Sequence, residues 1–234
     1  MMKITLILFV VFISSLSFSQ ESAVSVLQKY NFTAQNIFEI VDVANSSYSF
    51  TVNATTQTYS KANGVDNKIT RSYDFNYKNM EGEKFTLLKV KGKEPSGRKI
   101  KKFNKEKNSV QTGKDILLNA NNFFIKLNDD NTTIIGFTFP KEQLPSKLAF
   151  MAHSTGFIYI DKESAKINKI EIKSNESFNL KIFYVTSLDI VFNLDYDVQH
   201  EMYIISNENT EMNVLIFGGS TNIKTEETYS DYKF

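Results

Sequence analysis

The densest group of chemically active side chains lies between positions 89 and 107. This segment holds nine lysine or arginine residues against two acidic residues, Glu94 and Glu106. Lysines of this kind can protect a sheet edge from aggregation. They can also bind anionic headgroups or an acidic partner, since each basic residue near an anionic surface contributes roughly 1 kcal/mol. The candidate docking patch consists of Lys89, Lys91, Arg98, Lys99, Lys101 and Lys102.

Aromatic residues at alternating positions form a second candidate site. Alternate residues of a strand share one face, so these side chains are expected on the inner face of a curled sheet. There they would either pack against a helix as core or line an apolar ligand cavity, depending on how completely the helix fills the concavity. The predicted lining residues are Tyr48, Phe50, Tyr73, Phe75, Tyr77, Phe178, Tyr184 and Phe192.

Residues that could act in catalysis or bind a metal show no recognisable spacing. His153 and His200 lack a His-x-x-x-His or His-Glu pattern that would converge on a metal. Asp189, Asp195 and Asp197 could in principle build a calcium site, but no glycine-centred loop accompanies them. The chain has no Gly-x-Ser-x-Gly motif and no cysteine. We therefore predict a non-enzymatic protein with no catalytic residues, no metal and no cofactor.

The N-terminus predicts where the protein works. A short basic start, an apolar run from Ile4 to Ile13 and small residues before Gln20 form the pattern of a cleavable export signal. The run is shorter than the roughly 20 apolar residues that a membrane helix needs. Since there is no cysteine, a lipid-modified cysteine and disulfides are excluded. We expect a signal peptide at 1–19 and one domain at 20–234, a soluble periplasmic protein without a lipid anchor.

Composition limits the choice of partner. The formal net charge of +1 supplies no global field for nucleic acid, so we predict no nucleic-acid partner and look for a local patch instead. Exported proteins without disulfides are typical of bacterial envelopes. A chain of this length can bury enough apolar surface to fold as one domain, and we expect a monomer.

The periodicity of apolar residues changes once along the chain. From Ala23 to Val41 the steps of four and three predict one face of a helix, which Ser22 can cap and which can break into two near Asn31. Later segments alternate with period two and follow one another as hairpins, which predicts an antiparallel sheet. A long loop is expected from Pro140 to Gly156, and a helical piece is predicted over 114–120. The predicted strands cover 48–54, 69–77, 85–90, 100–103, 133–139, 157–160, 167–172, 178–184, 188–196, 202–206, 214–217 and 228–234.

These elements predict a mainly β (α+β) fold. A sheet of about ten strands must curl or split to bury its apolar face, and a helix with one apolar stripe can fill the concave side. We expect a curled antiparallel half-barrel wrapped around the N-terminal helix.

The C-terminal half carries motifs that resemble a known family. These are Phe139-Pro140, the segment Gly156-Phe157-Ile158-Tyr159-Ile160-Asp161-Lys162-Glu163 with Ile167 and Ile170, and the terminal Tyr229-Ser230-Asp231-Tyr232-Lys233-Phe234. Together they resemble LolA-like envelope proteins, relatives of the outer-membrane lipoprotein-sorting carriers, of the type found in Bacteroidetes. Where relatives often have a Trp-Leu-Pro-like segment, this chain has residues 202–207. The resemblance implies an unclosed half-barrel with an apolar cavity that accepts acyl chains.

Two functions follow as hypotheses. The first is a periplasmic carrier that holds a lipid or lipoprotein acyl chain, or another apolar ligand, between sheet and helix. The alternative is an envelope module with a filled cavity that acts through its surface on a protein or a membrane.

Overall fold

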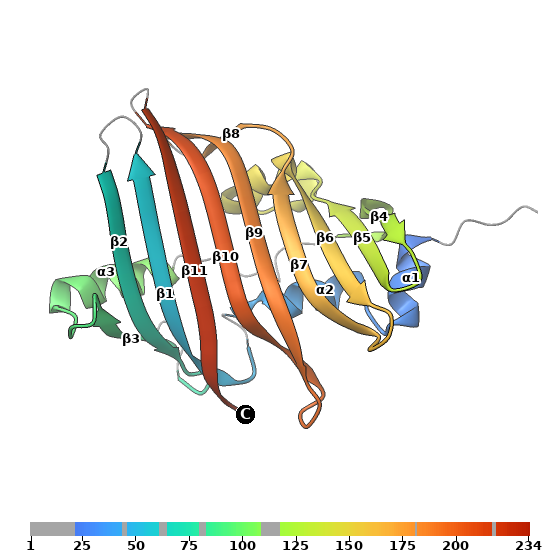
Figure 1. The fold of residues 1–234 in the computed structure, drawn as a ribbon, viewed down its shortest axis with the longest axis horizontal. Helices are drawn as coiled ribbons and strands as arrows, with labels where there is room; N and C mark the ends of the chain where they lie inside the picture. The colour runs from blue at the N-terminus through green and yellow to red at the C-terminus, as the bar shows by residue number, and fades with distance from the viewer. Residues whose placement is uncertain are drawn as a thin grey trace, which may run out of the picture.

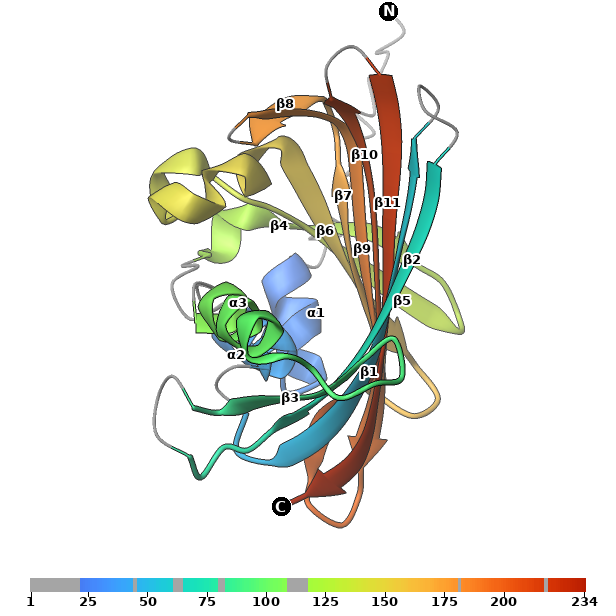
Figure 2. The ribbon, with the colours of Figure 1, turned by 90° about the vertical axis from the view of Figure 1, so that its left-hand side faces the viewer.

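A curved antiparallel sheet of eleven strands dominates this computed structural model (Figure 1). The structure describes residues 22–43, 46–60, 65–79, 83–108, 118–180, 182–216 and 219–234; the predicted signal peptide lies outside them. The helices lie on one side of the sheet, which we call the concave face, and the other side is the outer face (Figure 2). The predicted open antiparallel half-barrel around helical elements is confirmed.

The order of strands across the sheet brings the two ends of the chain together. The order is β3-β2-β1-β11-β10-β9-β7-β6-β5-β4, and β8 pairs with β9. The last strand, β11, thus lies between β1 and β10. The strands are β1 (Ser49–Ser60), β2 (Val65–Phe75), β3 (Phe85–Val90), β4 (Phe123–Asn128), β5 (Thr132–Thr138), β6 (Ser154–Asp161), β7 (Lys166–Ser174), β8 (Phe178–Leu180), β9 (Phe183–Asp197), β10 (Met202–Ile216) and β11 (Gly219–Lys233).

The predicted N-terminal helix is two short helices, α1 (Ala23–Lys29) and α2 (Ala34–Val41). The Ser22 hydroxyl accepts a hydrogen bond from the Ser25 amide at 3.1 Å, which confirms the predicted cap. The chain turns at Asn31, whose φ of 61° is tolerated by asparagine better than by most residues. The other helical elements are α3 (Gly97–Asn108) and the 3₁₀ turns η3 (Ala120–Asn122), η4 (Lys141–Gln143) and η5 (Ser146–His153). No helix in the described ranges is long and apolar enough to cross a membrane.

Some observed elements differ from the predicted ones. Residues 100–103, predicted as a strand, belong to α3. The prediction was wrong because a window of four residues is too short to distinguish the period of a strand from that of a helix. The loop predicted to run to Gly156 contains η4 and η5 and ends where β6 begins. Strand β4 was not predicted. The predicted helical piece at 114–120 lies mostly outside the described residues.

The last strands are longer than predicted. The break expected at residues 186–187 lies inside β9, and residues 202–206 and 214–216 belong to one strand, β10, whereas residue 217 of the predicted segment lies outside the described residues. Polar residues 207–211 hid this continuity, since they interrupt the apolar alternation. The sheet tolerates Asn207, Asn209 and Glu211 because its outer face meets solvent, whereas Glu208 and Thr210 lie on the face of the buried Val214.

The main core lies between the concave face and the helices. Its centre includes Ile135, Phe137 and Ile158, which are fully buried. Gly156 lies opposite Phe137 on the neighbouring strand, and a Cβ there would collide with the phenyl ring. A smaller cluster consists of Phe178, Val185, Leu188 and Val214 and packs where β9 begins and β10 ends.

Candidate functional site

A cavity of about 680 Å³ opens between the helices and one end of the sheet. Its volume falls within the range of about 300 to 1,000 Å³ that small-molecule sites occupy. We call it the rim cavity. It is lined by Lys29, Tyr30, Asn31, Phe32, Glu39, Ile40, Ser46, Ser47, Tyr48, Ala165, Lys166, Tyr196, Glu201, Met202 and Tyr203.

Three turns with left-handed backbone surround the rim cavity. Asn31 lies in the turn between α1 and α2, Ala165 in the β6–β7 turn and Glu201 in the β9–β10 turn, with φ values of 61°, 55° and 54°. All three residues line the cavity. Such conformations cost energy for non-glycine residues and often occur where a site is shaped. The opening is therefore built by turns from three separate parts of the chain.

Aromatic rings form the walls of this cavity. The ring of Tyr203 lies 5.7 Å from that of Phe32 and 5.1 Å from that of Tyr196, centroid to centroid. The Tyr203 hydroxyl accepts a hydrogen bond from the Ile167 amide at 3.1 Å, which fixes the ring. Burial raises the pKa values of the Tyr203 and Tyr48 hydroxyls, so both stay neutral. These walls offer apolar contact without charge.

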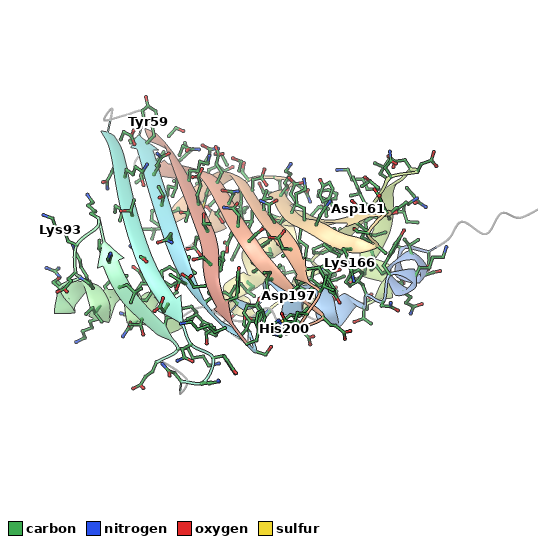
Figure 3. All side chains as sticks on the ribbon, turned by 60° about the horizontal axis from the view of Figure 1, so that its bottom comes forward. Tyr59, Lys93, Asp161, Lys166, Asp197 and His200 are labelled. Carbon is green, nitrogen blue, oxygen red and sulfur yellow. The ribbon has the colours of Figure 1, made fainter. Side chains whose placement is uncertain are left out.

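Charged side chains lie at the opening. The Lys166 ammonium group lies 3.5 Å from the centroid of the Tyr196 ring. In the adjoining β9–β10 turn, the His200 amide donates to the Asp197 carboxylate at 3.0 Å and lowers its pKa, and the His200 ring stacks on Phe234. Figure 3 shows Lys166, Asp197 and His200 at one end of the sheet, with Tyr59 at the opposite end. The cavity thus has apolar walls and a polar mouth.

The aromatic residues predicted from the sequence do not gather around one space. Of the eight, Tyr48 lines the rim cavity. Phe50 and Phe75 stack at 4.8 Å inside the main core, Tyr77 follows β2 and is half-buried, and Phe192 packs on the same core. The other three residues are Tyr73, Phe178 and Tyr184.

Tyr184 lies on the outer face and is 44 % exposed, so its predicted inward placement is wrong. The turn between β8 and β9 resets the alternation between it and Phe178, which is buried in the smaller cluster. Tyr73 is buried on the concave face of β2, beside a polar group that the sequence did not predict.

That polar group, which we call the carboxyl cluster, consists of Glu208, Glu227, Tyr73, Tyr229 and Lys107. Glu208 and Glu227 lie directly opposite each other on β10 and β11. Tyr73 donates to Glu227 at 2.9 Å, and the Lys107 ammonium donates to the Tyr73 hydroxyl at 2.8 Å. The Tyr229 hydroxyl lies 3.2 Å from an oxygen of each carboxyl group. The cluster therefore connects β2, β10, β11 and α3.

The Glu208 carboxyl group is buried beside the carboxyl group of Glu227, and this environment changes its pKa. Burial, and after it the charge of Glu227, raise the pKa of Glu208 to about 7, whereas the hydrogen bond from Tyr229 and the charge of Lys107 act in the opposite direction. One hydroxyl proton cannot serve two carboxylates at once. A protonated Glu208 can donate to the Tyr229 oxygen while Tyr229 donates to Glu227. Like charges opposite each other in a sheet are destabilising, and a retained proton removes that repulsion.

The sequence contained a weak signal for the carboxyl cluster. Every second residue of a strand lies on the same face, so the face of β10 that carries the buried Val214 also carries Glu208, Thr210 and Met212. Which residue lies opposite depends on the register of β11, and no local pattern gives that register.

Comparison with known proteins gives structural likeness alone. No family model matches the sequence, and no curated protein matches it. The chain is similar to a LolA superfamily protein of Nitrosomonas europaea, with 14% identity over 87% of this chain and 94% of the other and a TM-score of 0.33. It is also similar to a Vibrio parahaemolyticus domain described as an outer membrane lipoprotein-sorting protein, with 10% identity over 84% and 91% and a TM-score of 0.32.

A third likeness is to a DUF1329 family protein of Desulfovibrio piger, with 10% identity over 91% of this chain and 93% of the other and a TM-score of 0.34. The fold class of this chain rests on its own strand order, not on these three likenesses.

The residues of the predicted docking patch all lie exposed at one corner of the molecule. Lys89 belongs to the edge strand β3, and Lys91 to the turn that follows it. The remaining four, Arg98, Lys99, Lys101 and Lys102, lie on α3.

The two histidines lie apart from each other. His153 contacts Glu176 at 2.6 Å, and His200 contacts Asp197 at 3.2 Å. Within the described ranges, no group of three or more metal-ligating side chains is found.

Proposed function

We propose that this protein is an exported, non-catalytic binding protein that holds an acyl chain or another apolar moiety in the rim cavity. The cavity carries the proposal, because it lies between sheet and helices and has aromatic walls. The export signal and the sequence motifs of LolA-like carriers support a location in the bacterial periplasm. We infer the domain to be residues 20–234.

The lining chemistry favours an amphiphile over a fully polar ligand. Tyr30, Phe32, Tyr48, Tyr196 and Tyr203 provide apolar contact area, and burial of each methylene group contributes about 0.8 kcal/mol. Charged groups of both signs at the mouth leave the polar end of such a ligand near solvent. No polar side chain is needed to recognise the acyl chain of the ligand, which is consistent with the lack of a distinctive sequence motif.

Filling the cavity tests this proposal. Ile40 lines the cavity and is half-buried, so Ile40→Trp is expected to occupy ligand volume. Ile100→Trp is the matched control, because Ile100 lies on α3, outside the cavity lining. We would titrate delipidated protein with a fluorescent fatty-acid probe. We expect at least about tenfold weaker binding for Ile40→Trp and little change for the control.

Native mass spectrometry before and after organic extraction provides an independent measurement. An extractable lipid-sized mass on protein from its host supports the carrier function and identifies the cargo. If delipidated protein binds no acyl probe and none raises its melting temperature, the proposal is wrong.

A further inference from the structure

Helix α3 is amphipathic, and its two sides have different chemistry. Ile100, Phe103 and Lys107 follow the i, i+3, i+7 spacing that places residues on one helix face. Phe103 is 3 % exposed, and its ring lies 5.2 Å from that of Tyr73 on the sheet. The exposed cations of the helix, which we call the α3 face, are Arg98, Lys99, Lys101, Lys102 and Lys105.

The carboxyl cluster fixes the rotation of α3 about its axis. The Lys107 ammonium lies 4.3 Å from the Tyr73 ring centroid and 5.3 Å from that of Phe85, and it donates to the Tyr73 hydroxyl. Next to it, Arg71 of β2 pairs with Glu106 at 3.3 Å. These contacts turn one lysine inward, and as a result the α3 face points away from the sheet.

The exposed cations continue from α3 onto the neighbouring strand. Lys89, Lys91 and Lys93 are exposed on β3 and its turn, and Figure 3 shows Lys93 beside α3. In the part of the chain that the structure describes, Lys99 and Lys101 have no carboxylate partner, and neither has Lys105; Lys102 lies 3.7 Å from Glu106. Protection of the sheet edge accounts for lysines on β3, but not for five cations on a helix.

We propose that the α3 face, together with Lys89, Lys91 and Lys93, docks on the anionic headgroups of a membrane surface. Eight exposed cations gather at one corner of a chain whose total charge is +1, so the positive field is local. Seven of the eight are lysines. Lysine is depleted at protein interfaces, whereas its point charge suits a fluid array of phosphates. Phe103, on the apolar side of α3, already packs on the protein, and the α3 face itself carries only cations, so docking is electrostatic and reversible.

Vesicle sedimentation tests the docking surface. Purified protein is mixed with vesicles of phosphatidylcholine alone or with phosphatidylglycerol added. We expect binding to the anionic vesicles only, weakening as salt rises. Lys99→Gln, Lys101→Gln and Lys102→Gln combined should weaken partitioning about 100-fold, since each cation contributes about fivefold. The same residues changed to arginine should restore it.

A matched variant controls for net charge. Lys68→Gln, Lys141→Gln and Lys233→Gln remove three exposed lysines elsewhere, and we expect at most about a twofold change. Unchanged partitioning of the α3 variant, or equal binding to uncharged vesicles, would overturn the proposal. If only an acidic polypeptide such as polyglutamate binds, salt-sensitively, the partner is a protein and the membrane proposal is wrong. Acyl-probe binding to the rim cavity is measured separately, so the two proposals can fail independently.

Discussion

The two halves of the concave face bury different chemistry. Under β5, β6 and β7 the face is apolar, with Ile135, Phe137 and Ile158 fully buried. Under β2, β10 and β11 the same face carries the carboxyl cluster, in which Glu208 and Glu227 keep some accessible surface. The first half is stabilised by burial alone, whereas the second depends on hydrogen bonds, a cation and a proton. One curved sheet therefore combines a pH-independent half with a pH-dependent half.

The largest effect is expected in the apolar half. Phe137→Ala removes a ring that contacts Phe123 and Phe139 and covers Gly156. We expect the free energy of unfolding to fall by about 3 to 5 kcal/mol, measured by urea denaturation. The loss should be the same at pH 6 and pH 8, since no charged group of the carboxyl cluster is involved.

Phe124→Ala is the control for that variant. Phe124 lies on the outer face and is 41 % exposed, so its truncation should cost less than half as much. If both variants lost the same free energy of unfolding, the concave and outer faces would not differ in their contribution to stability, and the comparison would be wrong.

In the polar half, stability should depend on pH through Glu208. Its pKa of about 7 in the folded protein exceeds the ordinary value of 4.5, so the folded state binds more protons between these values. The stabilisation is fully present below about 4.5 and is lost as pH rises through about 7, by up to about 3 kcal/mol. Urea denaturation of Glu208→Gln from pH 5 to 8 should show a flatter profile than the unchanged protein.

Glu226→Gln is the matched control, because Glu226 is exposed on the outer face of β11 and Lys224 lowers its pKa. Its profile should follow that of the unchanged protein over this range. If Glu208→Gln also follows it, Glu208 does not hold a proton in the folded state and the comparison fails.

Removing the cation of the carboxyl cluster should have a smaller effect. Lys107→Met takes away the ammonium donor of Tyr73 and should cost about 2 kcal/mol. Because the Lys107 charge lowers the pKa of Glu208, that pKa should rise above about 7, as measured by carboxyl NMR titration. Lys105→Met, on the exposed side of α3, should change stability by less than about 0.5 kcal/mol and leave the pKa unchanged.

Regular alternation of apolar and polar residues predicted much of the sheet. Where polar residues interrupt this alternation, the extent of the strands could not be predicted. The segments that became β1 and β2 alternate cleanly and were expected to be neighbours, and they pair as antiparallel neighbours in the sheet. The segments that became β10 and β11 are largely polar, because one of their faces meets solvent and the other carries the carboxyl cluster. The helical nature of α3 was missed because the segment is mostly charged, and Ile100 and Phe103 alone are too few apolar residues to establish a helical period.

The candidate sites could be predicted only in part. The exposed cations are visible as composition, and the docking patch predicted from them stays a prediction. The rim cavity was not visible, because its walls come from α1, α2 and the ends of β9 and β10, which are distant in the sequence.

By itself, the sequence determined the class of this protein. Local periodicity is a property of neighbouring residues, so it specified a capped N-terminal helical segment and antiparallel strands that must curl. Only the tertiary structure placed Glu227 opposite Glu208 and brought Lys107 of α3 to the Tyr73 hydroxyl, which donates to Glu227. Strand register and helix docking are set by the packing of the whole sheet, and the resulting burial raises the pKa of Glu208.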